Sequence, residues 1–191
     1  MSTSRDAGHF DRLYQSNPDP WGFRTSAYEQ AKYAATLSAL GDGKFRSGLE
    51  VGCSIGVLTR LLAPRCEQMM GIDIVEAPLR EARAWCADMP HVRFERMQVP
   101  GTWPAGRFDL IVLSEVLYFL SSDDIGRCAD RVRSCLLPRA SVVLVNWLGQ
   151  TDDPTPGMAA AEQFIRATDG ALVPALRTWD EGYRLDLLRA R

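Results

Sequence analysis

One segment, residues 49–56, constrains the fold of this chain more than any other part of the sequence. A short apolar strand runs into Gly52, a tight loop follows, and a helix is expected to begin at about Val57. Further along, a second apolar run over residues 69–72 ends in Asp73. A glycine-rich turn from strand to helix, followed by an acid at the tip of the next strand, is how an open α/β sheet holds a nucleoside cofactor.

The rest of the chain alternates between strand and helix patterns in the same way. Strands are predicted at 49–51, 69–74, 92–97, 108–113, 141–145 and 183–189, and helices at 27–40, 57–63, 77–87, 123–137 and 158–168. Such alternation implies parallel βαβ units with right-handed crossovers. We therefore predict one doubly wound, Rossmann-like domain over residues 1–191, with an N-terminal helical cap or lid at 1–45 and the core at 46–191.

Composition narrows the possible partners and compartments. A net charge of −2 gives no reason to expect nucleic acid or an anionic membrane as a partner. The five cysteines form no Cys-x-x-Cys pair and are expected as buried, reduced thiols, and the two histidines, His9 and His91, lie too far apart to suggest a metal site. With no signal-peptide pattern and no apolar run of about 20 residues, a cytoplasmic protein is expected, as a monomer or weak dimer.

The glycine loop argues against a dinucleotide cofactor. A dinucleotide fingerprint requires Gly-x-Gly-x-x-Gly, but Ser54 replaces its middle glycine and Val57 stands at the position of its third. Gly52 and Gly56 remain, and either can allow close backbone approach or a positive φ. Because the middle glycine normally lets the backbone approach a pyrophosphate, its loss disfavours NAD.

Two acids flank this loop and suggest what it binds instead. The carboxylate of Glu50 can accept a hydrogen bond from a cationic amine, a group that the pyrophosphate region of NAD does not present. Asp73 can accept two hydrogen bonds from a ribose diol. The pattern therefore favours an adenosine cofactor that also carries an amine.

Three segments resemble motifs of a known family. Residues 49–56, 71–73 and 108–117 are similar to motifs I, II and IV of the class I S-adenosylmethionine-dependent methyltransferases, and the likeness of strand order and spacing extends over the chain from about residue 46. The resemblance implies a seven-stranded sheet that is mostly parallel, with an antiparallel last strand. It also implies S-adenosylmethionine as cofactor and S-adenosylhomocysteine as product.

The resemblance also assigns residues to parts of the cofactor. Gly52 and its neighbours would pack on the methionine part, Asp73 would bind the ribose, and Ile74 would flank the adenine. The loop at 97–99 would meet the adenine edge, where Gln98 stands in place of the Asp found in many members. The complete expected cofactor set is Trp21, Arg24, Glu50, Gly52, Cys53, Gly56, Asp73, Ile74, Gln98, Val99 and Ser114.

A closer resemblance involves the N-terminal region. Residues 19–21 with Arg24, Tyr28 and Glu29, together with the later run 115–120, resemble the nodulation protein S family. That family N-methylates the amino sugar of a chitooligosaccharide signal, so the resemblance implies methyl transfer to an amine. Transfer to the oxygen of a small metabolite, a nicotinamide-dependent oxidoreductase and an inactive cofactor-binding module remain as alternatives.

The acceptor side of the site is expected around Glu115 and Tyr118, the two candidate catalytic residues. Glu115 directly follows a buried strand at the ligand end of the sheet, where it either orients or deprotonates the acceptor or hydrogen-bonds backbone. Tyr118 either faces the acceptor or packs against the next helix. Trp21, Arg24 and Tyr28 form a lid over cofactor and acceptor, or pin the N-terminal helix to the core.

Two further patterns invite comparison with motifs of other enzyme families but do not indicate their functions. Residues 28–32 spell the Tyr-x-x-x-Lys of short-chain dehydrogenases, but they precede the glycine loop, whereas that family has the motif far downstream. We therefore interpret the match as chance. Residues 114–117 are not the Asn/Asp-Pro-Pro-Tyr of methylases that act on nucleic-acid bases or glutamine. A small-molecule or oligosaccharide acceptor is expected.

Overall fold

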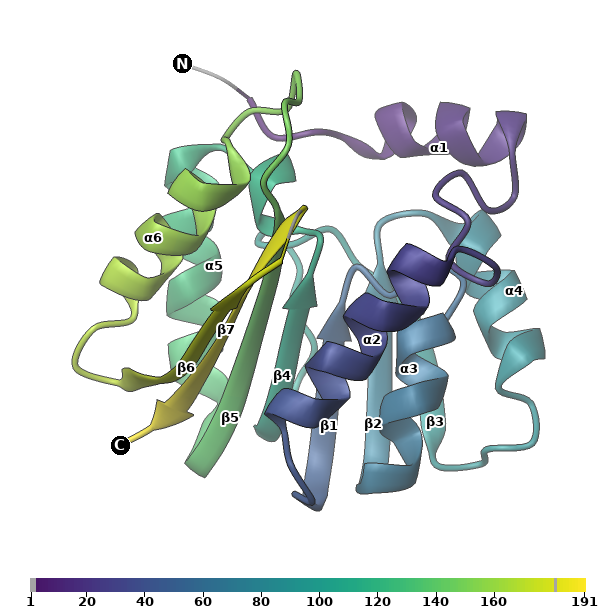
Figure 1. The fold of residues 1–191 in the computed structure, drawn as a ribbon. Coiled ribbons are helices and arrows are strands. Elements are labelled where there is room, and N and C mark those ends of the chain that lie inside the picture. Colours follow the sequence, from purple (N-terminus) through teal and green to yellow (C-terminus); the bar gives the residue numbers. More distant parts are fainter. Residues whose placement is uncertain (1–2, 181) are drawn as a thin grey trace.

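Seven strands form one sheet in the order β3-β2-β1-β4-β5-β7-β6 in the computed structural model, which describes residues 3–180 and 182–191 (Figure 1). All neighbouring pairs from β3 to β5 are parallel, whereas β7 is antiparallel to both β5 and β6. The predicted doubly wound sheet with an antiparallel last strand is thus confirmed. The strands are β1 (Phe45–Val51), β2 (Cys66–Asp73), β3 (Val92–Arg96), β4 (Phe108–Ser114), β5 (Leu136–Trp147), β6 (Leu172–Trp179) and β7 (Tyr183–Ala190).

Helices cover both faces of this sheet. Apolar side chains of α2 and α3 share one hydrophobic cluster with one face, and those of α5 and α6 share another cluster with the opposite face. The helices are α1 (Ala7–Ser16), α2 (Ala27–Ala39), α3 (Val57–Leu62), α4 (Glu76–Trp85), α5 (Ser122–Cys135) and α6 (Gly157–Ala167), with 3₁₀ turns η1 (Ala63–Arg65) and η2 (Leu117–Phe119). Within the described residues, no helix is long and apolar enough to cross a membrane.

The strand β4 lies at the centre of this arrangement. Ile111 and Leu113 point into the cluster with α5 and α6, while Leu110 and Val112 point into the cluster with α2 and α3. All four side chains are fully buried. A strand covered on both faces reads as a continuous apolar run, which is why residues 108–113 were recognisable as a strand.

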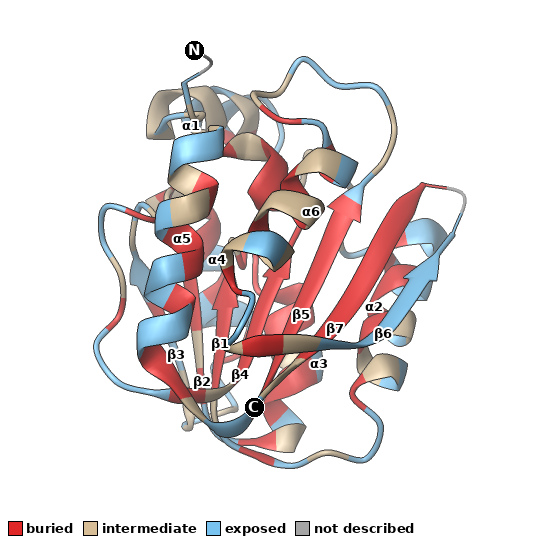
Figure 2. Ribbon diagram, turned by 90° about the vertical axis from the view of Figure 1, so that its left-hand side faces the viewer, coloured by how far each residue is buried: buried red, intermediate tan, exposed pale blue. Residues whose placement is uncertain are grey.

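Two elements have no counterpart in the sequence prediction. The helix α1 buries only Tyr14, and it was missed in the sequence although Phe10, Leu13 and Tyr14 recur at helical spacing. The strand β6 is an edge strand that pairs only with β7; it contains Pro174 and is almost entirely exposed (Figure 2). An edge strand without a buried face shows no alternation of apolar and polar residues.

The N-terminal segment crosses the carboxyl ends of the strands before the chain enters α2 (Figure 1). It is fastened near its start, because Arg5 Nε lies 3.0 Å from Asp153 Oδ1 and the Arg5 N–H donates to the carbonyl of Phe119 at 2.9 Å. Ser4 Oγ donates to Asp124 Oδ2 at 2.6 Å. The segment therefore roofs the edge of the sheet where ligands bind in such folds. The division into a cap at 1–45 and a core at 46–191 stays a prediction.

Candidate active site

A cavity of about 660 Å³ lies at the carboxyl ends of β1, β2 and β4, beneath α1 and the segment that follows it. The strand order reverses between β1 and β4, and a doubly wound sheet opens a crevice at that point. Ten of the thirteen predicted site residues line the cavity: Trp21, Glu50, Gly52, Cys53, Asp73, Ile74, Val99, Ser114, Glu115 and Tyr118.

The glycine loop takes the backbone shape that its composition predicts. Gly52 has φ 74°, and a Cβ atom there would lie 2.4 Å from Cγ2 of Val116, so any side chain would collide with the protein. Gly56, the N-cap of α3, has φ 77°, and its added Cβ would lie 2.9 Å from that of Ala82 on α4. Gly52 therefore keeps the cavity wall close to backbone, while Gly56 serves the packing of the loop against α4.

Asp73 closes this loop from the tip of β2. Its Oδ2 accepts from the N–H of Ser54 at 2.9 Å, and its Oδ1 accepts from that of Val75 at 3.0 Å. Burial raises the pKa of this carboxyl to about 6, against the effect of these backbone donors. Each oxygen can still accept one more hydrogen bond, which suits a ribose diol.

Glu50, near the end of β1, also lines the cavity. Its side chain is buried and accepts a hydrogen bond from the Thr59 hydroxyl. Burial, with a smaller effect from Asp73, raises the pKa of this carboxyl to about 8. A cation placed beside it would favour the ionised form, so Glu50 is suited to a ligand that carries an ammonium group.

Aromatic side chains from the N-terminal segment cover the loop. The Tyr14 hydroxyl lies 2.5 Å from Ser54 Oγ, which links α1 directly to the glycine loop. The Tyr14 ring meets Trp21 edge to face, at 5.7 Å between centroids. Asp19 fixes the turn that carries Trp21, because its carboxylate accepts from the N–H of Phe23 at 2.8 Å. Tyr14 was not among the predicted site residues.

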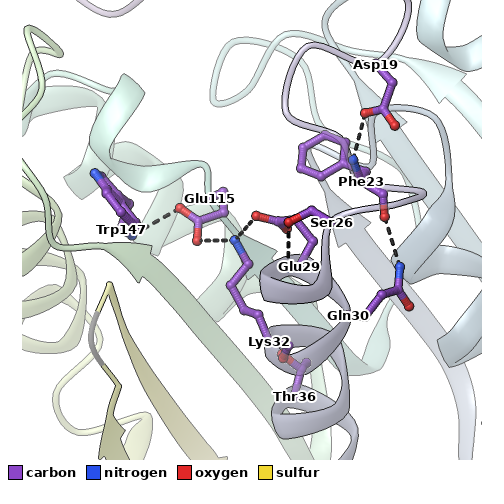
Figure 3. A network of polar contacts seen from close by, with 9 residues as sticks. All are labelled: Asp19, Phe23, Ser26, Glu29, Gln30, Lys32, Thr36, Glu115 and Trp147. Carbon is purple, nitrogen blue, oxygen red and sulfur yellow. Dashed lines mark hydrogen bonds and ion pairs between the residues drawn. The ribbon is translucent and has the colours of Figure 1, made fainter.

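A buried ion cluster forms the other half of the cavity. Lys32 of α2 is 2% exposed, and its Nζ lies 2.9 Å from Glu29 Oε1 and 2.9 Å from Glu115 Oε1 (Figure 3). The second oxygen of Glu115 accepts the N–H of Trp147 at 3.0 Å. Glu115 thus hydrogen-bonds backbone and also faces the cavity, and its contact with an acceptor stays a prediction. We name Glu29, Lys32 and Glu115 the charged triad.

Tyrosines around the charged triad remain protonated at neutral pH. Burial and the Glu115 carboxylate raise the pKa of the Tyr118 hydroxyl well above its usual value. Burial and the same carboxylate also raise the pKa of Tyr28, whose ring lies 5.1 Å from Lys32 Nζ. A hydroxyl with a raised pKa donates a hydrogen bond instead of removing a proton. Tyr118 is therefore suited to orient an acceptor, not to deprotonate it.

Partly exposed aromatic rings lie where the cavity opens to solvent beside the charged triad. Tyr28 contacts Trp147 edge to face at 6.0 Å and Tyr183 at 6.1 Å between centroids. Trp21, Tyr28 and Trp147 all line the cavity and keep more than a third of their surface exposed. These rings offer flat apolar faces beside the charged triad.

Three predicted residues lie outside the cavity lining. Arg24 is exposed, with its guanidinium 5.0 Å from the centroid of the Trp85 ring and 3.4 Å from Glu81. Gly56 packs against α4, and the Gln98 N–H donates to the hydroxyl of Thr102 at 2.7 Å. Their contacts to a cofactor stay predictions.

Glu29 and Lys32 are not among the residues predicted for the site. They fall in the run over residues 28–32 that we interpreted as a chance match. A usable signal was present, because Glu29, Lys32, Tyr33 and Thr36 repeat at helical spacing and form the buried face of α2. Opposite charges three residues apart on a buried helix face point to a site, since unpaired charges are costly to bury.

The fold and this site together define a class I S-adenosylmethionine-dependent methyltransferase, with the glycine loop at β1 and the acid at the tip of β2. The model of the nodulation protein S (NodS) family matches residues 10–142, and the chain belongs to this family. The resemblance found in the sequence is therefore confirmed.

Individual relatives show how far the similarity extends. The nodulation protein S of Bradyrhizobium diazoefficiens is 38% identical over 103 residues, which cover 53% of this chain and 49% of that protein. That of Sinorhizobium fredii is 29% identical over 168 residues, covering 86% of this chain and 77% of the relative. The match thus spans about half of the first relative's length and about three quarters of the second's.

A solved structure shares the fold over nearly its whole length. The N-methyltransferase NodS from Bradyrhizobium japonicum, in complex with S-adenosyl-L-homocysteine, superposes with a TM-score of 0.82 at 24% identity. The match covers 96% of this chain and 97% of that one. The likeness shows the class I methyltransferase fold.

The residues present fit S-adenosylmethionine. Gly52 keeps the wall open where a Cβ would meet Val116, Asp73 has acceptor capacity for a ribose, and Glu50 is a buried acid without a cationic partner among the described residues. The described residues contain no group of three or more His, Cys, Asp or Glu placed to hold a metal ion.

Proposed function

We propose that this protein transfers a methyl group from S-adenosylmethionine to the amine of an amino sugar, with a chitooligosaccharide as the acceptor class. The observation that carries the proposal is the charged triad, which places two carboxylates against one ammonium inside the cavity. The excess of acid attracts a cationic amine. The relatives named as nodulation protein S and as an N-methyltransferase support the same reaction.

The cofactor half supplies binding and orientation. S-adenosylmethionine, when bound, supplies a sulfonium-activated methyl group to the acceptor nitrogen. Gly52 and Cys53 would line its methionine end, Glu50 would accept from its ammonium, and Asp73 would accept from its ribose. Because the cofactor provides the electrophile, the chain's task is to align the two ligands and to exclude water. The roof made by Tyr14 and Trp21 serves that exclusion.

The acceptor half suits a sugar that carries a charge. The rings of Trp21, Tyr28 and Trp147 present apolar faces on which the C–H face of a pyranose can pack, beside polar groups that can fix its orientation. Tyr118 donates to the acceptor, and Glu115 accepts from it. The three rings lie at the partly exposed mouth, so the remainder of an oligosaccharide can extend into solvent.

We place this activity in the cytoplasm. The five cysteines are all free and buried, and burial raises the pKa of each of their thiols. Five unpaired thiols fit a reducing compartment, where disulfides are rare.

Product analysis tests the proposal. The protein is incubated with methyl-labelled S-adenosylmethionine and either a glucosamine oligomer or the matched fully N-acetylated oligomer, and the products are analysed by mass spectrometry. We expect one labelled methyl group on the oligomer that has a free amine and none on the acetylated control. Label on the acetylated oligomer would indicate transfer to oxygen, and no label on either would contradict an amino-sugar acceptor.

A further inference from the structure

The two carboxylates of the charged triad differ in what they can still accept. Both oxygens of Glu115 have donors, since one faces Lys32 Nζ and the other takes the N–H of Trp147. In Glu29, Oε1 is paired with Lys32 at 2.9 Å, and the Tyr33 hydroxyl also interacts with this carboxyl. Its Oε2 is buried without a hydrogen-bond partner of normal geometry. Glu29 itself lines the cavity and is 6% exposed.

An unpaired buried carboxylate oxygen is costly, so it needs an explanation. Glu29 can accept a donor from a ligand without losing any contact that it already has. Each oxygen of Glu115, by contrast, already has one donor, Lys32 Nζ or the N–H of Trp147 on β5, so it is a weaker proton acceptor than the unpaired Oε2 of Glu29. We propose that Glu29 is the proton acceptor of the reaction and removes the proton that the acceptor ammonium must lose before methyl transfer. The inference rests on the proposed amine acceptor and gives Glu29 a role that the sequence pattern had suggested for Glu115.

The surroundings of Glu29 support this role. Burial raises the pKa of its carboxyl, while Lys32 and the Tyr33 hydroxyl lower it and the Glu115 carboxylate raises it. A base with a raised pKa holds a proton more readily than an exposed carboxylate does. The titratable and charged groups that face Glu29 are Tyr28, Lys32 and Tyr33 on its own helix, Glu115 after β4, and Tyr118 in η2.

The proton transfer is balanced within the site. The acceptor ammonium gives one proton to Glu29 Oε2, the nitrogen keeps the electron pair of its N–H bond, and the carboxylate becomes a carboxylic acid. The neutral amine then has the lone pair that attack on a methyl group requires. Lys32 keeps its hydrogen bonds to Glu29 Oε1 and Glu115 Oε1, so it holds both acids in place as a positioning residue. Glu29 later releases the proton to water.

The pH dependence of turnover separates this role from a structural one. Initial rates of methyl transfer to a glucosamine tetramer are measured between about pH 6 and about pH 9.5, over which free amines lose their protons. Glu29→Gln should lose about 100-fold in kcat/KM at neutral pH, a typical contribution of a general base. It should recover to within about fivefold at the alkaline end, where the amine arrives already neutral. Glu115→Gln should lose activity to a similar degree at every pH.

A second readout does not depend on turnover. Carbon-13 NMR of the protein with labelled glutamate side chains should show, besides the raised titration of Glu50, a second carboxyl that titrates above the ordinary range and is missing in Glu29→Gln. The exposed Glu67 on β2 supplies the matched control, because Glu67→Gln should change neither the rates nor that signal. S-adenosylhomocysteine binding by calorimetry should be equal in wild type and Glu29→Gln, which shows that the variant is folded.

The possible outcomes test the role of Glu29 separately from the proposed function. If the wild type methylates the tetramer and Glu29→Gln follows the same pH profile, Glu29 is not the proton acceptor. A loss in Glu29→Gln that does not recover at alkaline pH also overturns the role, since it indicates that the side chain only maintains structure. If the wild type methylates neither this tetramer nor longer glucosamine oligomers, the proposed function fails first and the inference falls with it.

Discussion

The two halves of the cavity are built by different means. The cofactor half consists of a loop in which Gly52, Ser54 and Gly56 have positive φ, with backbone N–H groups that donate to Asp73. The acceptor half consists of long charged side chains from α2 and the end of β4, tied to one another through Lys32. One half is shaped by the backbone and the other by ion pairs.

This difference affects how each half responds to change. A backbone loop keeps its shape whatever is bound, and it tolerates few side chains at its glycines. An ion cluster in a buried site depends on the complete set of charges, because removing one partner leaves another charge without compensation. We therefore expect substitutions in the acceptor half to cause the larger loss in the free energy of unfolding. Substitutions in the cofactor half should cause the larger loss in ligand affinity.

Removing the central cation should have the largest effect. Lys32→Met leaves Glu29 and Glu115 buried without their cation, and breaking a buried ion cluster in this way costs about 3 kcal/mol or more. The loss should grow with pH, because burial raises the pKa of Glu29 and protonation at lower pH removes its uncompensated charge. Urea unfolding at two pH values measures it. The matched variant Lys44→Met, at an exposed surface position, should change the free energy of unfolding by less than about 0.5 kcal/mol.

Adding a methyl group at Gly52 tests how the loop backbone shapes the cofactor half. Gly52→Ala adds strain at φ 74° and a collision with Val116, so we expect a loss of about 2 kcal/mol in affinity for S-adenosylhomocysteine by calorimetry. Gly170→Ala is the control for strain alone, since Gly170 has φ 84° with no heavy atom near the added Cβ. It should lower stability by about 1 kcal/mol and leave binding unchanged. Equal binding by all three proteins would show that Gly52 does not shape the cofactor site.

The buried acid Glu50 should make cofactor binding depend on pH. Because its folded pKa is raised to about 8 from an ordinary 4.5, the folded protein holds an extra proton between these values and loses stability as pH rises across that window. An ammonium placed beside Glu50 favours the carboxylate, so binding releases the proton. Affinity for S-adenosylhomocysteine should therefore increase from about pH 6 to about pH 8, by at most about tenfold per pH unit.

The variant Glu50→Gln provides the comparison for this pH dependence. Its affinity should be lower and nearly flat over the same range, and calorimetry in two buffers of different ionisation enthalpy should show no proton release. Identical pH profiles for wild type and Glu50→Gln would remove Glu50 as the partner of the cofactor ammonium.

The smallest effect concerns the link between the roof and the loop. Tyr14→Phe removes the hydrogen bond to Ser54 and should lower affinity for S-adenosylhomocysteine by about 1 kcal/mol. The change should lie mainly in a faster dissociation rate, measured by stopped-flow fluorescence, because the roof covers the bound ligand. A dissociation rate equal to that of wild type would show that α1 does not retain the cofactor.

The contrast between the halves also explains what the sequence could predict. Gly52, Asp73 and the run into Ser114 belong to contiguous motifs, so the fold, the cofactor half and the position of Glu115 followed from local patterns. Lys32 meets Glu115 only because the fold brings α2 to the end of β4, and no local pattern records that contact. Glu29 and Lys32 were passed over for this reason, although their buried helical spacing was visible.

Elements with little buried surface escaped prediction for a different reason. The edge strand β6 buries few side chains, so hydrophobic periodicity gives it no clear signal, whereas α1 carries an apolar period in Phe10, Leu13 and Tyr14 that was missed. Arg24 and Gln98 were assigned from a resemblance, and the structure places both outside the cavity lining. Resemblance transfers the backbone frame of a family more securely than it transfers individual side-chain contacts.

The position of β7 has a consequence for how the protein is made. The strand β6 is synthesised before β7, yet it reaches the rest of the sheet only through β7, which lies between β5 and β6. On a ribosome, β6 must wait for the following strand to emerge before it gains a partner. The parallel strands up to β5 meet no such delay, so nascent chains arrested before Tyr183 should hold the cofactor loop in place while β5 still has an open edge.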